Sequence, residues 1–286
     1  MDRRKFITRT AQATALLAVL PNIACASTTN GSGIFNEFGI QLWTLRDIIY
    51  ANPQKTIAEV GKMGFTQIES FEGEKGIFWG MKPAEFKSFL DGEGLKLISS
   101  HCNWQIDLAR KADEVASVGG KYLMCPWLGP QKSIDDFKSY ADKFNKAGEI
   151  CKKAGIKFAY HNHDYSFKEL DGQIPQQVMM DLTDANLVDF EMDMYWVVTA
   201  GINPIEYMTK YKNRFQLCHI KDRIKDAKEP FASCTLGEGS IDYAKILKEA
   251  KALNMKYFIY EQEKYDDKGV LFDAEQSAAY LKKLKK

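Results

Sequence analysis

The chain alternates short apolar runs with longer amphipathic segments, and this pattern limits its fold more than any other feature. Segments with helical spacing of apolar residues occur at 53–62, 83–94, 108–118, 134–154, 243–252 and 274–284. Apolar runs of strand length occur at 39–45, 67–71, 96–101, 121–126, 156–161, 187–192, 215–220 and 257–261. Eight strands that alternate with helices in a chain of this length predict a closed (β/α)8 barrel, a single-domain TIM barrel.

The main alternative is an open, doubly wound sheet. A dinucleotide-binding sheet of that kind needs a glycine-rich phosphate loop after its first strand, and none follows the run at 39–45. The pattern therefore favours the barrel. The weakest helix prediction is 173–182, after an Asp-Gly turn.

All four histidines lie at the carboxyl ends of predicted strands. His161 and His163 follow one run, while His101 and His219 end two others. Residues i and i+2 of a strand face the same side, so His161 and His163 can point into one site. A barrel has its active site at the carboxyl ends of its strands, so this placement predicts a metal site or an acid–base site.

Carboxylates stand at the same strand ends. Glu69 ends the second run, Glu191 and Asp193 share one face of the sixth, and Glu261 ends the eighth. Carboxylates that met in one buried place would repel each other and have raised pKa values. Together with imidazoles, they predict a site for a divalent cation such as Mn, Co, Zn or Mg.

Four motifs make the chain resemble the sugar phosphate isomerase/epimerase superfamily, the xylose isomerase-like TIM barrels. They are Gly39-Ile-Gln-Leu-Trp-Thr-Leu-Arg46, Tyr160-His-Asn-His-Asp164, Glu191-Met-Asp193 and His219-Ile-Lys-Asp222, followed by Glu261. The resemblance covers residues 39–286. In ketose 3-epimerases of this superfamily one metal is held by Glu, Asp, His and Glu. Carried over by position, the resemblance implies His161, Asp193, His219 and Glu261 as metal ligands.

The chain departs from those epimerases at two positions. His161 stands where they have a glutamate that is both ligand and base, and Trp196 stands where they have a histidine. The Tyr-His-Asn-His pattern is closer to the branches of the superfamily that resemble inosose dehydratases or cleave 3-keto-glycosides.

A common chemical step follows from a metal beside a ketone. The metal acidifies the neighbouring C–H bond and stabilises the enediolate, while a base removes the proton. The candidate catalytic residues are His163, Glu261 and Lys221. The candidate substrate-binding residues are Trp43, Glu69, His101, Trp127 and Trp196, the tryptophans because they can stack on sugar faces.

The main functional expectation is a metal-dependent isomerase or epimerase that acts on a free ketose or keto-sugar. The first alternative is a metal-dependent lyase or dehydratase that acts on a 3-keto-glycoside or a keto-inositol. The second is a non-catalytic, periplasmic sugar-binding barrel. The expected partner is a small carbohydrate, with a sugar oxidoreductase as the source of the ketone. The oligomeric state stays open and includes a homo-oligomer.

Residues 1–26 have the features of a twin-arginine export signal. Arg3 and Arg4 precede a short apolar run at 11–20, and Ala24-Cys25-Ala26 fits a small-x-small cleavage site. The signal predicts a periplasmic protein, with lipidation of Cys25 as a second interpretation. Residues 27–38 are expected to form a linker, and 39–286 the barrel.

Composition excludes two classes of partner. The whole chain has a net charge of +1, and removal of residues 1–26 leaves about −2. Without a basic patch or a second apolar span, the sequence predicts neither nucleic-acid binding nor a membrane span. Five cysteines remain after the signal, an odd number without a CxxC motif, so no disulfide framework is expected.

Overall fold

The structure, a computed structural model, describes residues 33–285, which form a closed barrel of eight parallel strands. The barrel closes where β1 pairs with both β2 and the last strand, β10. The barrel strands are β1 (Gly39–Gln41), β2 (Gln67–Phe71), β3 (Lys96–His101), β4 (Tyr122–Cys125), β5 (Lys157–His161), β6 (Val188–Asp193), β7 (Phe215–Ile220) and β10 (Tyr257–Tyr260). The predicted (β/α)8 barrel is confirmed.

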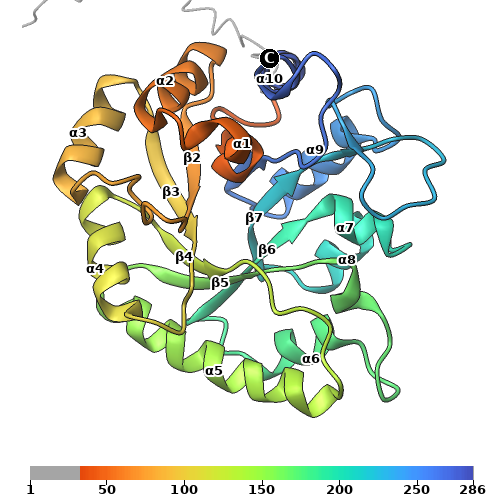
Figure 1. Ribbon diagram of the computed structural model, residues 1–286. Helices are drawn as coiled ribbons and strands as arrows, with labels where there is room; N and C mark the ends of the chain where they lie inside the picture. The colour runs from red at the N-terminus through yellow and green to blue at the C-terminus, as the bar shows by residue number, and fades with distance from the viewer. Residues whose placement is uncertain (1–32, 286) are drawn as a thin grey trace, which may run out of the picture. The chain divides into compact units, whose positions relative to one another are not determined.

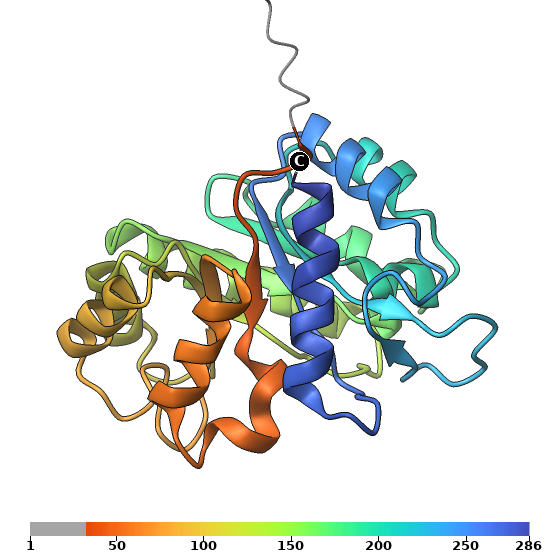
Figure 2. The same cartoon turned by 90° about the horizontal axis from the view of Figure 1, so that it is seen from above.

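Helices surround the strands (Figure 1). They are α1 (Arg46–Ile49), α2 (Pro53–Met63), α3 (Pro83–Gly92), α4 (Leu108–Val118), α5 (Ile134–Lys153), α6 (Pro175–Leu182), α7 (Met194–Thr199), α8 (Pro204–Lys210), α9 (Tyr243–Ala252) and α10 (Val270–Leu284). The last helix lies beside α2 (Figure 2).

Local sequence signals explain several helix ends. Asn52 caps α2 by accepting a hydrogen bond from the backbone N–H of Lys55, and Pro53 occupies the first turn, where no N–H is needed. The same helix ends at Gly64, whose φ of 93° suits glycine. Ser133 and Asp136 form a capping box at the start of α5.

A small apolar cluster fills the barrel below the predicted site. It consists of Ile98, Tyr122, Met124, Ala159, Leu217 and Ile259. Leu217 and Ile259 precede His219 and Glu261 by two residues, so each pair faces the same side of its strand. The polar side chains therefore stand on an apolar floor, at the carboxyl end of the barrel.

The structure differs from the sequence prediction in three places. The first strand ends at Gln41, because its side chain accepts a hydrogen bond from Trp43 N and starts a 3-10 helix, η1 (Leu42–Leu45). Helices α7 and α8 occupy a stretch where no helix was predicted. Two short strands, β8 (Asp222–Arg223) and β9 (Ser233–Cys234), form an antiparallel hairpin after β7.

The described part of the expected linker packs against the barrel. Phe35 and Phe38 are buried, and Ile34 N donates a hydrogen bond to Leu284 O. The predicted export signal and Cys25 lie outside the described residues.

No helix in the described part is long and apolar enough to cross a membrane. The five cysteines of residues 33–285 are all free thiols.

Candidate functional site

A cavity of about 550 Å³ opens at the carboxyl ends of the barrel strands. Its polar lining includes His101, His161, His163, Glu261 and Glu263. Two sequence-predicted tryptophans, Trp43 and Trp127, also line it, together with Phe71, Trp104 and Phe231, which were not predicted.

The structure brings the four predicted metal ligands together. His161 ends β5, Asp193 ends β6, His219 lies in β7, and Glu261 directly follows β10. One ligand atom from each lies within 4.8 Å of the others, and all four residues are buried. Nε2 of His161 is 3.4 Å from Oδ2 of Asp193, and Nδ1 of His219 is 3.2 Å from Oε2 of Glu261.

Glu191 joins His101, His161 and His219 in a second group. Its Oε2 lies 3.3 Å from Nε2 of His101, 3.3 Å from Nδ1 of His161 and 3.2 Å from Nε2 of His219. In the first group Nε2 of His161 and Nδ1 of His219 face the carboxylates, whereas in the second group the opposite ring nitrogens face Glu191. A neutral imidazole has one lone pair for a metal, so the groups are alternatives. The sequence signal for Glu191 was its position two residues before Asp193.

The position of Glu69 favours metal binding by the first group, which consists of His161, Asp193, His219 and Glu261. Glu69 is completely buried, and its Oε1 lies 2.7 Å from Nε2 of His219 and 2.6 Å from Nε2 of Gln41. Ser99 donates a hydrogen bond to the other oxygen. Burial favours a raised pKa for Glu69, but His101 and His219 hold that pKa well below its usual value. When His219 is a neutral imidazole, as a metal ligand is, this contact favours its proton on Nε2 and leaves Nδ1 to the first group.

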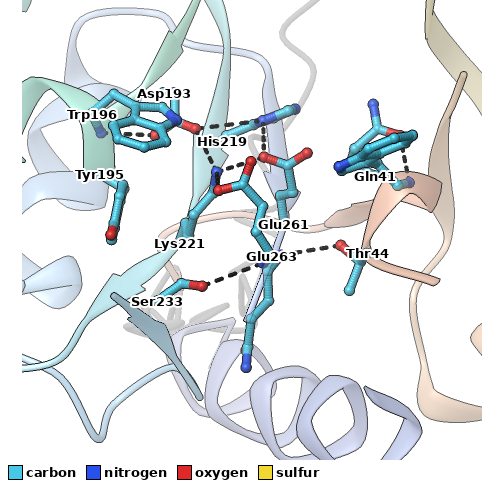
Figure 3. Close-up of polar contacts among 12 residues, drawn as sticks. Gln41, Thr44, Asp193, Tyr195, Trp196, His219, Lys221, Ser233, Glu261 and Glu263 are labelled. Carbon is cyan, nitrogen blue, oxygen red and sulfur yellow. Dashed lines mark hydrogen bonds and ion pairs between the residues drawn. The ribbon is translucent and has the colours of Figure 1, made fainter. Parts of the chain in front are cut away.

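Lys221 is buried among three carboxylates (Figure 3). Its Nζ lies 2.7 Å from Glu261, 3.1 Å from Asp193 and 3.2 Å from Glu263. Burial opposes the charge, but Asp193 and Glu261 raise the pKa of Lys221 well above its usual value. With these carboxylates as its partners Lys221 is held as an ammonium ion, a form that donates a proton and does not accept one, so its role as a base stays a prediction.

His163 has the opposite electrostatic setting. Its ring packs edge to face on Trp127 and lies beside that of Trp196, with centroids 4.4 Å and 5.3 Å away. Burial, then the nearby His161 and Lys221, lower the pKa of His163 well below its usual value. The side chain is therefore a neutral imidazole at pH 7, and it lines the cavity.

The residues present fit a divalent cation. Within the described chain, both ring nitrogens of His161 and Oε1 of Glu191 are buried without a hydrogen-bond partner, and Oδ2 of Asp193 has an ion pair with Lys221 but no hydrogen bond. Buried polar atoms without a hydrogen bond lower the stability of the fold unless another group, such as a metal ion, binds them. Two imidazole nitrogens and two carboxylate oxygens form a donor set that suits Mn, Co or Zn. A cation would also offset the charge of the carboxylates, which Lys221 only partly neutralises.

Two predicted substrate-binding residues do not line the cavity. Glu69 lies beneath His219, and Trp196 is buried behind His163. The backbone N–H of Trp196 donates a hydrogen bond to Asp193 Oδ1 at 3.0 Å. Trp196 therefore holds a predicted ligand in place.

A family model described as xylose isomerase-like TIM barrel matches residues 57–284. Among curated proteins, the chain is similar to the inosose dehydratase of Geobacillus kaustophilus, with 29% identity over 185 residues. That match covers 58% of this chain and 59% of the relative. An inosose dehydratase of Clostridium perfringens is 28% identical over 194 residues, which cover 63% of this chain and 61% of the relative. The chain thus spans about three fifths of the length of these curated relatives.

Among solved structures, the chain is similar to a sugar phosphate isomerase/epimerase from Parabacteroides distasonis. The two are 29% identical with a TM-score of 0.71, over 92% of this chain and 98% of the other. A 3-keto-D-glucoside 4-epimerase from E. coli is 17% identical with a TM-score of 0.68, over 86% of this chain and 99% of the other. At this lower identity the likeness concerns the fold alone.

Proposed function

We propose that this chain, which belongs to the xylose isomerase-like TIM barrel family, is an enzyme that acts on a ketone-bearing sugar or cyclic polyol. The proposed reaction removes a proton from the carbon next to the ketone. One observation carries the proposal: the buried group of His161, Asp193, His219 and Glu261 meets the cavity through His161 and Glu261, beside the neutral His163.

A divalent metal held by His161, Asp193, His219 and Glu261 would polarise the ketone and stabilise the negative charge of the enediolate. The protein supplies the rest of the chemistry. Lys221 keeps Asp193 and Glu261 ionised and oriented toward one point. Glu69 orients His219 from below, through Nε2.

His163 is the proposed base. It lines the cavity next to His161, with ring centroids 4.8 Å apart, and it is unprotonated at neutral pH. Its Nδ1 is buried and has no hydrogen-bond partner among residues 33–285. A neutral imidazole in this place can take the proton from a substrate carbon.

We propose elimination of a β-oxygen as the next step, which makes the protein a lyase or dehydratase. The similarity to proteins named inosose dehydratase supports this choice. The residues support it too, because epimerisation needs a base on each face of the reacting carbon. His161 replaces the glutamate that supplies one of those bases in ketose 3-epimerases.

Isomerisation or epimerisation is the second candidate. Its support is the 29% identity to the sugar phosphate isomerase/epimerase of Parabacteroides distasonis, which extends over 92% of the chain. Both candidates share the proton abstraction and differ only in the fate of the enediolate.

The proposed setting is the periplasm. It rests on the export signal expected in residues 1–26, and a sugar oxidoreductase in the same compartment would provide the ketone. Comparing the N-terminal peptide of the exported protein with that of the cytoplasmic precursor tests this part. A mature protein that retains residues 1–26 would contradict it.

Proton exchange in deuterated water tests the proposed reaction. Metal-loaded protein is given an inosose, methyl 3-keto-glucoside and free ketoses, and NMR follows deuterium at the α-carbon and any product. We expect exchange and an unsaturated ketone product from the inosose or the keto-glucoside. An epimeric product would favour the second candidate, and the lack of exchange with all substrates would exclude both. His219→Ala protein is the inactive control.

A further inference from the structure

Three exposed aromatic side chains surround the mouth of the cavity. Trp43, Trp127 and Phe231 are 41%, 52% and 56% exposed, and they come from η1, the loop after β4 and the β8–β9 hairpin. Of the four exposed tryptophan and phenylalanine side chains in the described part of the chain, only Phe272 lies elsewhere. Exposed apolar groups gathered at one cavity mark a binding surface.

Each of these rings is braced by a buried or half-buried ring at a steep angle. Trp43 packs on Phe71 with centroids 5.0 Å apart and an interplanar angle of 83°. Trp127 packs on His163 at 4.4 Å and 87°, and Phe231 on Trp196 at 5.1 Å and 80°. The rings are therefore oriented before a ligand arrives, which lowers the entropy lost on binding.

The hairpin that carries Phe231 is also held in place. The carboxylate of Asp222 accepts hydrogen bonds from the backbone N–H groups of Gly237, Gly239 and Ile241. A Cβ at Gly239 would lie 2.1 Å from Asp222 Oδ1, so the loop needs glycine there. Next to Phe231 in the chain, Ala232 N donates a hydrogen bond to Tyr195 Oη at 2.7 Å. Phe231 is therefore part of a preformed surface.

The side chains that line the cavity differ in depth. His101, His161 and Glu261 are buried and define its inner end, whereas the three aromatic rings are exposed and stand at its outer end, with the exposed polar side chains of Asn103 and Gln105. A small, fully hydroxylated substrate would use the inner end alone. A volume of about 550 Å³ lies within the range of sites for larger ligands.

We propose that the substrate is a glycoside: a keto-sugar ring fills the inner end, and a second ring, linked to it through the glycosidic oxygen, packs against the aromatic rim formed by Trp43, Trp127 and Phe231. This inference rests on the proposed function for the inner ring. The second ring offers a face for stacking, as either an aryl group or another sugar does. In the proposed elimination, that ring leaves with the glycosidic oxygen as its hydroxyl, and the inner sugar becomes an unsaturated ketone.

The test compares three substrates that differ only in the leaving group. They are methyl 3-keto-β-glucoside, phenyl 3-keto-β-glucoside and cellobiose oxidised at C3 of its non-reducing ring. We expect kcat/KM for removal of the α-proton, counted as deuterium exchange plus elimination product, to be roughly tenfold higher or more for at least one ring-bearing substrate than for the methyl glycoside. Preference for the phenyl compound assigns an aryl group, and preference for the disaccharide assigns a sugar.

Variants show whether the aromatic rim causes the preference. Phe231→Ala and Trp127→Ala should each reduce the ratio of ring-bearing to methyl kcat/KM roughly 2- to 10-fold. Phe272→Ala, which removes an exposed ring from α10 away from the cavity, should leave the ratio unchanged. Equal kcat/KM values for the three substrates would overturn the inference and leave the proposed function intact.

A binding measurement keeps the inference testable without turnover. Calorimetry compares the affinity for the unreactive phenyl β-glucoside and cellobiose with the affinity for methyl β-glucoside. The difference measures how much the aromatic rim contributes to binding. Tighter binding of a ring-bearing glycoside that Phe231→Ala abolishes supports the inference, even if no keto-sugar exchanges and the proposed function fails. No difference among the three glycosides overturns it.

Discussion

Oε1 of Glu69 lies 2.7 Å from Nε2 of His219, at the bottom of the site. The contact holds the imidazole so that Nδ1 faces Glu261, at 3.2 Å from its Oε2. Gln41 and Ser99 in turn donate hydrogen bonds to Glu69. A residue expected from the sequence to bind substrate therefore orients a predicted metal ligand.

Replacing this carboxylate should weaken metal binding. In Glu69→Gln the side chain no longer carries the charge that holds the His219 proton on Nε2. We expect the affinity for Co²⁺ to fall roughly 10- to 100-fold, measured by competition with a chelator. Glu114→Gln, on the outer face of α4, is the matched control. Equal affinity in the wild type and Glu69→Gln would show that Glu69 does not orient the ligand.

Mutations of the metal ligands and of the proposed base should have different effects on metal content and on proton exchange. Asp193→Asn and His219→Ala remove donors of the same group, so elemental analysis should find less than one metal ion per chain. His163→Ala should retain the metal and lose proton exchange, because His163 belongs to neither ligand group. Loss of metal in His163→Ala, or unchanged metal content in His219→Ala, would contradict the assignment.

The pH profile should reflect the lowered pKa of His163. The base is active when unprotonated, so kcat/KM for exchange should stay on its plateau below pH 6.5 and fall only at lower pH. An acidic limb with its midpoint at or above pH 6.5 would contradict this expectation.

The lowered pKa of His163 also affects the stability of the fold. In the window below pH 6.5 the unfolded chain binds a proton that folded His163 does not. The free energy of unfolding therefore decreases as the pH falls through that window, and His163→Ala should lessen the decrease. Urea unfolding at several pH values measures it.

Replacing Lys221 should destabilise the fold most when no metal is bound. Lys221→Met leaves Asp193 and Glu261 buried without their cation, which costs about 3–5 kcal/mol for a broken buried pair. A divalent ion on the same carboxylates should recover part of this loss. Urea unfolding with and without Mn²⁺ tests the coupling, with the solvent-exposed Lys168→Met as control. Equal destabilisation with and without metal would argue against a shared charge site.

Much of the architecture follows from the sequence alone. The alternation of apolar runs with amphipathic segments predicts the barrel, because each strand and helix has its own spacing of buried residues. The barrel rule then brings the histidines and carboxylates at the strand ends to one end of the barrel. The resemblance to ketose 3-epimerases singles out His161, Asp193, His219 and Glu261 among them, and the structure has these four together. The barrel needs only local patterns and one topological rule, whereas the choice of ligands also needs the family resemblance.

The tertiary structure decided the depth and the surroundings of each side chain. Alternation along a strand indicates that Glu191 and Asp193 share a face, but only the register of the closed barrel brings Glu191 against three histidines. The same register places Glu69 below His219. Phe231 reaches the cavity mouth because Asp222 binds backbone groups 15 to 19 residues further along the chain. Such contacts join distant segments, and no local pattern of residues encodes their geometry.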